Sequence, residues 1–204
     1  NKDLSAAVAA LVAAGFSREP SQRRLTESVL EIPMYAPPPS GTLVELHTSM
    51  DKVVQRPVDL GAVFSRARPS ENDGLLLPSL EDQLLFVVQH LGSDEFRHAT
   101  GMVDLQVLLE AGVDLEMAAQ RARQWQSRAV LYVALAALQS MLGERVVPNR
   151  LLQALRPRSR QLALIKTHFN IGSWPVAKRP TRLGPRWMYG QVTMRDEPLA
   201  FIAG

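Results

Sequence analysis

Apolar residues recur at helical spacing near the start of the chain. One stripe consists of Leu4, Val8, Leu11 and Val12, within an alanine-rich background. This i, i+4, i+7, i+8 spacing predicts an amphipathic helix. Asp3 is its expected N-cap and Gly15 its expected end, because aspartate accepts hydrogen bonds from free N–H groups and glycine readily follows a helix in the left-handed conformation.

Two segments with nearly alternating apolar residues follow this helix. Residues 27–35 and 42–48 have the pattern of β-strands, and three consecutive prolines and a Ser-Gly turn lie between them. This arrangement predicts a hairpin. Because side chains alternate across a strand, Glu45 is expected to share one face of the second strand with Leu43 and His47.

Helical spacing returns in the second half of the chain. Ser79 is the expected N-cap of a helix that runs to about residue 91, and Asp82 stands at its third position, a weak form of the capping box. Further helices are predicted at residues 99–111, 114–125, 127–142, 151–155 and 159–169. The 99–111 helix has an apolar stripe of Val103, Val107 and Leu108. Because short connections make neighbouring helices antiparallel, an up-and-down bundle is predicted.

These patterns predict an α+β protein, in which a partial, small mixed β-sheet is followed by an antiparallel helical bundle. Residues 58–68 favour a short helix, and residues 68–74 have the composition of a linker. The expected domains are residues 1–68, residues 69–170 as the helical bundle, and residues 171–204 as an irregular basic tail. Lys178, Arg179, Arg182 and Arg186 form a cluster of basic residues in this tail.

Composition narrows the functional classes. The chain has 204 residues, 46% hydrophobic and 21% charged, which is typical of a globular protein. It contains no Cys, which excludes a disulfide framework, a thiolate zinc site and a cysteine nucleophile. No apolar stretch approaches the roughly 20 residues of a membrane span, so we expect a cytoplasmic protein without a membrane partner. A net charge of +3 does not require a nucleic-acid partner, and none is expected.

Three acidic positions are candidates for chemistry. Glu45 with His47 on a sheet face is compatible with a metal-binding or proton-transfer pair, and also with a solvent-facing surface. Asp104 stands among apolar residues and is expected to be buried, where it needs a partner such as His98. Asp114 begins a D-x-E pattern, which is compatible with a cation-binding pair, but its place at the start of a helix favours capping.

The histidines show no zinc-binding spacing. They are His47, His90, His98 and His168. His90 and His98 are expected on either side of one connection between helices, where they could face a common cleft with Asp104. This group is compatible with substrate contacts, and also with a polar contact that ties two helices together. The sequence contains neither a dinucleotide-binding G-x-G-x-x-G nor a phosphate-binding loop, and no G-x-S-x-G of a serine hydrolase.

The order of these motifs resembles a largely uncharacterised family of bacterial nucleotidyltransferases of the polymerase-beta-like superfold. The similarity covers residues 4–142. It is carried by the first helix, Leu43-Val44-Glu45-Leu46-His47, Pro78-Ser79-Leu80-Glu81-Asp82, His90, and Val103-Asp104-Leu105. The resemblance implies a small mixed sheet followed by a helical bundle, with residues 1–68 as the C-terminal part of a nucleotidyltransferase-like domain.

The resemblance also implies a chemistry. In this superfold, three carboxylates on adjacent strands hold two Mg²⁺ ions over the triphosphate of the NTP substrate. The Val-Glu-Leu pattern around Glu45 matches the third carboxylate, so Glu45 is the expected catalytic residue and metal ligand. His90, His98 and Asp104 are expected to contact the substrate by shaping the acceptor pocket. The implied activity is transfer of a nucleoside monophosphate to an unknown acceptor.

One part of the family pattern is missing from these residues. A Gly-Ser turn and a D-x-[DE] pair, which supply the other two carboxylates, should precede the first helix directly, and the sequence begins at Asn1. We therefore expect a catalytically incomplete fragment, or a relative that has lost the pair. The alternative function is a non-catalytic interaction module that binds a protein partner through the helical bundle.

Overall fold

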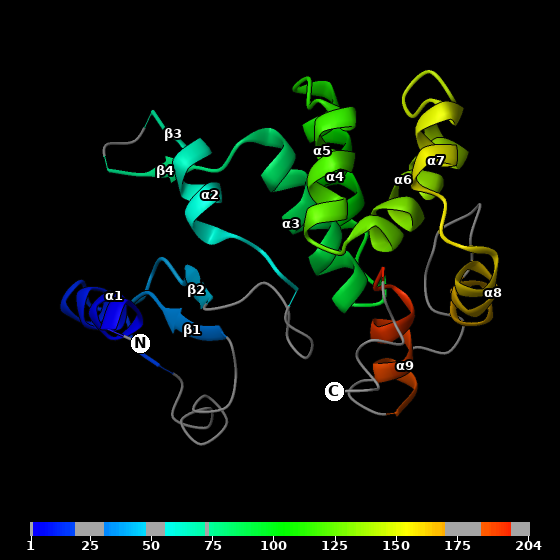
Figure 1. Cartoon of the computed structure of the whole chain (residues 1–204). Coiled ribbons are helices and arrows are strands. Elements are labelled where there is room, and N and C mark those ends of the chain that lie inside the picture. Colours follow the sequence, from blue (N-terminus) through cyan, green and yellow to red (C-terminus); the bar gives the residue numbers. More distant parts are fainter. Residues whose placement is uncertain (1, 19–30, 48–55, 72–73, 170–184, 197–204) are drawn as a thin grey trace. The chain divides into compact units, whose positions relative to one another are not determined.

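A computed structural model describes residues 2–18, 31–47, 56–71, 74–169 and 185–196 (Figure 1). The chain divides into two compact units, Asn1–Gln55 and Arg56–Gly204, which we call unit 1 and unit 2. Helices and separate antiparallel strand pairs occur together, so the predicted α+β class is confirmed. No helix in the described part of the chain is long and apolar enough to cross a bilayer.

Unit 1 contains the predicted helix and hairpin. Helix α1 is Lys2–Ala13, and strands β1 (Glu31–Tyr35) and β2 (Leu43–His47) pair in antiparallel fashion. Asp3 lies inside the first turn of α1, so its predicted place as the residue before the helix is wrong. Gly15 follows the helix with a φ of +89°, the left-handed conformation that glycine adopts without steric cost, and so ends the helix as predicted.

The hairpin has one apolar face and one mixed face. Ile32 and Met34 of β1 are buried, and they stand opposite Leu46 and Val44 of β2. The alternate positions of β2 are exposed, as the burial pattern of the strand shows. Glu45 therefore lies on the exposed face, as the alternation predicts.

Unit 2 begins with a short helix and a very short strand pair. Helix α2 is Leu60–Arg66, and the side chain of Asp59 caps its N-terminus. Strands β3 (Arg68–Pro69) and β4 (Leu76–Leu77) pair in antiparallel fashion. The predicted linker at residues 68–74 is thus partly wrong, because its first residues are held in this strand pair.

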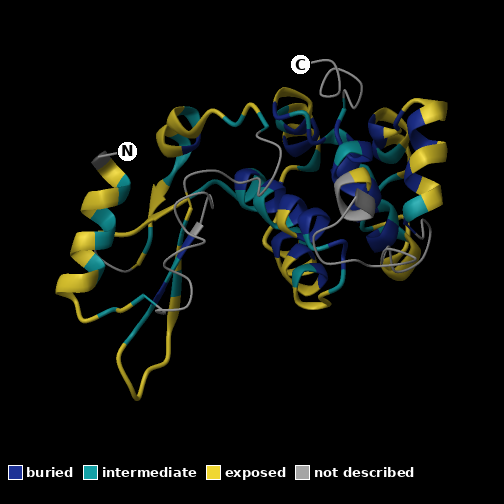
Figure 2. Ribbon diagram, turned by 90° about the horizontal axis from the view of Figure 1, so that it is seen from below, coloured by how far each residue is buried: buried dark blue, intermediate teal, exposed yellow. Residues whose placement is uncertain are grey.

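The rest of unit 2 is helical. Its helices are α3 (Leu80–Ser93), α4 (Thr100–Glu110), α5 (Leu115–Gln124), α6 (Arg128–Leu142), α7 (Asn149–Leu155), α8 (Ser159–His168) and α9 (Pro185–Thr193). The predicted helices between residues 79 and 169 all occur, within a few residues at each end. Buried positions concentrate in these helices (Figure 2).

Helices α3 and α6 pack closely in the core of unit 2. Gly92 of α3 makes this approach possible, since a Cβ there would lie 2.6 Å from Cγ2 of Val130 in α6. Leu84, Leu85 and Val88 of α3 are fully buried in the same core. A large side chain at position 92 would therefore separate the two helices.

The buried face of α4 differs from the predicted one. Met102, Leu105 and Leu108 are buried, while Val103 and Val107 are 58% and 56% exposed. Only Leu108 of the predicted stripe lies in the core. Helix α4 has apolar residues on both sides, so its spacing alone could not identify the side that packs.

Helix α9 corrects the expectation that the C-terminal residues are irregular throughout. Pro185–Thr193 is helical, and the side-chain amide of Gln191 donates hydrogen bonds to the backbone oxygens of Gly92 and Ser93. The basic residues Lys178, Arg179 and Arg182 lie outside the described residues, and only the backbone of Arg186 is described. Tertiary contacts thus hold a helix whose sequence shows little periodicity.

Asp196, three residues beyond the end of α9, caps a different helix. The carboxylate of Asp196 accepts hydrogen bonds from the N–H groups of Arg128 and Ala129, 3.1 and 2.9 Å long, in the first turn of α6. Ser127 precedes α6 but makes no capping bond, because its hydroxyl donates to the backbone oxygen of Trp125 and accepts from Gln89. Asp196 therefore supplies the cap that the local sequence lacks.

Candidate functional site

The main sequence candidate, Glu45, lies in the middle of β2, where its backbone is opposite Pro33 of β1. Its side chain is 43% exposed, and Oε2 lies 3.8 Å from Nε2 of His47, whose side chain is 34% exposed. The strand places the two residues on one face because they are two positions apart. The prediction that Glu45 and His47 share one face of the strand is therefore confirmed, and this face is exposed to solvent.

The two side chains are suitable donors for a divalent cation. A carboxylate oxygen and an imidazole nitrogen are both common metal ligands. Among the described residues, no group of three or more His, Asp or Glu side chains is arranged to hold a metal ion. Glu45 and His47 can thus form part of a metal site, while the described residues do not provide the three carboxylates of a two-metal site.

The second set of candidates lies at the end of α3 and on α4. His90 is in the last turn of α3 and its side chain is 58% exposed, with Nε2 3.3 Å from Oδ2 of Asp94. His98 is exposed in the connection between α3 and α4, and Asp104 is exposed on α4. The prediction that Asp104 is buried is therefore wrong.

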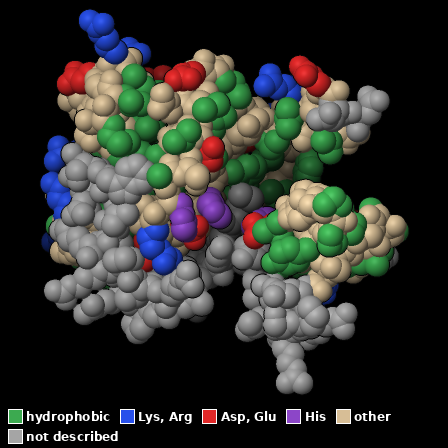
Figure 3. Space-filling view, turned by 180° about the vertical axis from the view of Figure 1, so that it is seen from behind, with side chains coloured by type: hydrophobic (Ala, Val, Ile, Leu, Met, Phe, Trp, Pro, Cys, Tyr) green, Lys and Arg blue, Asp and Glu red, His purple; other side chains and the backbone are tan. Residues whose placement is uncertain are grey.

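These three side chains are not joined to one another. Within the described part of the chain, no hydrogen bond or ion pair links His90, His98 and Asp104. Figure 3 shows histidine side chains at the molecular surface close to acidic ones. The three residues are accessible to a ligand, and the polar contact of His90 is with Asp94 instead of with α4.

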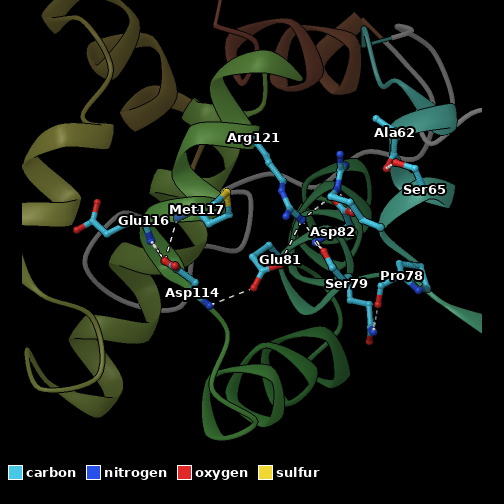
Figure 4. A network of polar contacts seen from close by, with 12 residues as sticks. Ala62, Ser65, Pro78, Ser79, Glu81, Asp82, Asp114, Glu116, Met117 and Arg121 are labelled. Atoms are coloured by element: carbon cyan, nitrogen blue, oxygen red, sulfur yellow. Dashed lines mark hydrogen bonds and ion pairs between the residues drawn. The ribbon is translucent and has the colours of Figure 1, made fainter. Parts of the chain in front are cut away.

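An acidic and basic network in unit 2 was not predicted (Figure 4). Asp82 is fully buried, and its two carboxylate oxygens accept hydrogen bonds from Nε and Nη2 of Arg66, each 3.0 Å long. Nη1 of Arg121 lies 3.0 Å from Oδ1 of the same carboxylate. Asp82 therefore joins α2, α3 and α5 through two arginines.

Arg121 extends this network to its neighbours. Its Nη1 also lies 3.2 Å from Oε2 of Glu81 and donates a short hydrogen bond to the hydroxyl of Ser79. The other oxygen of Glu81 accepts from the N–H of Asp114 at 3.3 Å. Two arginines and two carboxylates thus neutralise one another in a largely buried region, as buried charges require.

The sequence revealed only the local part of this network. Ser79 caps α3 as predicted, with its hydroxyl accepting from the N–H of Asp82. The Asp82 carboxylate was assigned to the capping box, but it binds the arginines instead. The missed signal is spacing, because Asp82, Leu85 and Gln89 share one buried helix face.

The Asp114 pattern is a helix cap. Oδ1 of Asp114 accepts hydrogen bonds from the N–H groups of Glu116 and Met117, both 3.0 Å long. The side chain of Glu116 is 63% exposed and lies 3.7 Å from Arg150. This D-x-E pattern therefore matches the predicted capping role, whose hydrogen bonds Figure 4 shows, and its second acid forms a surface ion pair.

A second buried pair involves His168, at the end of α8. Its Nε2 lies 3.0 Å from Oε1 of Glu95, and their side chains are 10% and 0% exposed. Gly190 of α9 packs directly on the imidazole, since a Cβ at that position would lie 2.6 Å from Nε2. This geometry indicates a packing role that holds α8 and α9 to the end of α3.

Comparison with known proteins identifies a family to which this chain is similar. A family model described as an uncharacterised nucleotidyltransferase matches residues 1–143. Among curated proteins and among solved structures, none matches the chain. The matched residues include the hairpin with Glu45 and the helices from α2 to α6.

Proposed function

The chain belongs to the uncharacterised nucleotidyltransferase family, and from this membership we propose that the protein takes part in metal-dependent nucleotidyl transfer. In this reaction a nucleoside monophosphate moves from an NTP to an acceptor, and pyrophosphate leaves. The nucleotide is the proposed substrate, and the acceptor is defined only by needing a nucleophilic group.

The position of Glu45 is the observation that supports this proposal. Its carboxylate lies at the centre of a strand and is 43% exposed, so a metal-nucleotide complex can reach it from solvent. The neighbouring residues Val44 and Leu46 point to the opposite side of the strand and are less exposed. An ordered backbone with one accessible acid fits the role of a metal-binding carboxylate.

Glu45 is the proposed ligand for a divalent cation, with Mg²⁺ as the family's expected ion. Such a cation, when bound, supplies positive charge that stabilises the phosphoryl oxygens and the departing pyrophosphate. Glu45 alone cannot hold two cations. We propose that the remaining carboxylates come from a D-x-[DE] segment next to α1 in the encoded protein, and that residues 1–204 are catalytically incomplete without it.

His90, His98 and Asp104 are the proposed acceptor-binding residues. All three are exposed, and they lie on α3, on α4 and on the connection between these helices. A surface with two imidazoles and a carboxylate can hydrogen-bond to a hydroxyl or amine acceptor. Substitution of these residues should weaken acceptor binding more than nucleotide binding.

The test is a transfer assay on the full encoded protein with labelled NTPs and Mg²⁺. Glu45→Gln keeps the size of the side chain and removes its charge, and it should reduce transfer by about a hundredfold or more. Glu144→Gln, at an exposed position in unit 2, is the matched control and should retain activity. Undiminished transfer by Glu45→Gln would remove Glu45 from the mechanism.

The second candidate function is a non-catalytic module that binds a protein partner through the helical bundle. The observation that favours it is the exposure of Val103 and Val107, one turn apart on α4. Absence of transfer with any NTP, together with partner binding that Val103→Asp abolishes, would support this function. Transfer that depends on Glu45 would favour the enzyme.

A further inference from the structure

We propose that Arg156, Arg158 and Arg160, at the junction of α7 and α8, form a surface that binds the phosphodiester backbone of a nucleic acid strand. We call these three residues the arginine cluster. They lie beyond residue 143, where the family match ends, so the proposal does not depend on nucleotidyl transfer. It adds to the protein a binding surface and a class of ligand.

The charges of the chain are strongly separated along the sequence. Between Glu144 and Asp196 there are eleven Lys and Arg residues and no Asp or Glu, and eighteen of the 20 acidic residues occur at or before Glu144. Such separation is typical of proteins that bind polyanions. The net charge of +3 conceals it, which is why the overall charge led to the expectation of no nucleic-acid partner.

The arginine cluster is presented from an anchored backbone. All three arginines are exposed, while Leu155, Pro157 and Gln161, which lie beside them in the sequence, are buried. The side-chain amide of Gln161 donates a hydrogen bond of 3.1 Å to the backbone oxygen of Thr193. Because the cluster spans five residues, its Cα atoms lie within about 14 Å of one another. Three positive charges are thus held close together at the surface.

Stability of the fold does not account for the cluster. Among the described residues, none forms an ion pair or a side-chain hydrogen bond with its three arginines. Arg158 and Arg160 stand at the N-terminus of α8, where the helix dipole disfavours positive charge. Other arginines of unit 2 are paired with an acid: Arg66 with Asp82, Arg128 with Asp196 and Arg150 with Glu116.

Two other exposed arginines of unit 2 show what distinguishes the cluster. Arg68 and Arg145 are exposed as well, but each is a single basic residue with a glutamate within three positions, Glu71 and Glu144 respectively. The cluster has three arginines within five positions and no acid within ten. Number and the lack of nearby acids, and not exposure alone, therefore mark this surface.

The chemistry of the cluster favours a strand of phosphates as the ligand. A guanidinium group binds phosphate oxygens through paired hydrogen bonds and stays charged at physiological pH. A nucleic acid carries a phosphate at every nucleotide, so one strand can contact all three arginines. An anionic bilayer fits less well, because binding there also requires inserted apolar side chains and α8 exposes only Leu164.

The test is fluorescence anisotropy of labelled single-stranded RNA and DNA of one sequence, titrated with the full chain at several salt concentrations. We expect binding that weakens with salt. The combined variant Arg156→Gln, Arg158→Gln and Arg160→Gln should lower affinity by about tenfold or more and reduce the slope of log K against log salt by about 2. Comparison of the two strands identifies whether RNA or DNA is preferred.

Two controls separate charge from folding. The corresponding triple lysine variant keeps the three charges and should keep the salt slope, and circular dichroism should show unchanged helix content in both triple variants. Arg158→Gln should reduce the slope by about 0.7, whereas Arg68→Gln, which removes one exposed charge elsewhere in unit 2, should leave it unchanged.

Several results would overturn the proposal. They are no binding of either strand, binding that does not respond to salt, equal effects of Arg68→Gln and Arg158→Gln, and a loss in the lysine variant as large as in the glutamine variant. Vesicles containing phosphatidylglycerol and a polyglutamate peptide are tested in parallel. Cluster-dependent binding to either of these without binding to the oligonucleotides would assign the surface to a lipid headgroup or to an acidic protein instead.

Discussion

The carboxylate of Asp82 accepts two parallel hydrogen bonds from the guanidinium of Arg66, each 3.0 Å long. The Asp82 side chain has no exposed surface, whereas that of Arg66 is 31% exposed. A buried carboxylate is tolerated because cations and donors replace its lost hydration. The pair therefore fixes α2 against α3 only while the charge of Asp82 is present.

Removal of that charge should destabilise unit 2. Asp82→Asn leaves Arg66 and Arg121 without their shared carboxylate, and the free energy of unfolding should fall by about 3–5 kcal/mol. Urea denaturation followed by circular dichroism measures this change. Glu116→Gln is the control, because it breaks an exposed ion pair with Arg150 and should cost less than about 1 kcal/mol. Similar losses in both variants would contradict the structural role of Asp82.

The contact between α3 and α6 predicts a steric effect. Gly92→Ala places a Cβ 2.6 Å from Cγ2 of Val130, so the helices must separate or the valine must move. We expect a loss of about 1–3 kcal/mol in the free energy of unfolding. Val130→Ala removes the obstructing methyl groups, and the double variant should therefore be less destabilised than the sum of the two single variants. Strict additivity would show that the two residues do not meet.

The pH dependence of stability should report on Asp196. Burial raises the pKa of its carboxyl from the ordinary value of 3.8, although hydrogen bonds from Ala129 and Arg128 and the charge of Arg128 oppose this rise. The folded state therefore binds the proton more readily than the unfolded state. The corresponding stabilisation is complete below pH 3.8 and is lost as the pH rises through the folded-state pKa.

Asp196→Asn isolates this contribution. The difference in unfolding free energy, wild type minus variant, should become more positive as the pH falls from neutral through the raised pKa of Asp196. The measurement is urea denaturation of both proteins over a pH series. The difference should be level at neutral pH, where the carboxyl is ionised in both states. If this difference in unfolding free energy instead became less positive as the pH falls, the pKa of Asp196 in the folded state would be lowered, contrary to the prediction.

Local chemistry explains most of what the sequence predicted. Ser79 and Asp114 cap their helices with bonds to residues two or three positions away, so short-range patterns suffice to find them. The strand that carries Glu45 was found from alternation, and its exposed face follows from the same rule. These features depend on neighbours in the sequence and not on packing.

Tertiary contacts explain what the sequence did not predict. Helix α4 has apolar residues on two sides, and its packing against α3 and α6 selects Leu105 over Val103 for the core. Asp82 looked like a capping residue because its arginines come from two other helices. Helix α9 depends on Gln191 and Asp196, whose bonding partners are far away along the chain.

Of the candidate site, only the place of Glu45 could be predicted correctly from the sequence. Glu45 could be singled out because a charged residue inside an apolar strand is conspicuous and because the surrounding motifs resemble a family. Asp104 was misplaced, since its apolar neighbours suggested burial whereas helical geometry turns its side chain to solvent. A one-dimensional pattern does not tell which side of a helix faces outward when both sides carry valine or leucine.

The cap that Asp196 provides for α6 has a consequence for shortened versions of the protein. The family match ends at residue 143, directly after the last residue of α6. The first turn of that helix, however, is capped by Asp196, which lies outside the match. A recombinant product that ends at residue 143 would leave the N–H groups of Arg128 and Ala129 without their acceptor. It would also lose the hydrogen bond from Gln191 to the backbone oxygen of Gly92. The end of the family match is therefore not the end of the part that folds together, and expression trials should retain the residues through Asp196.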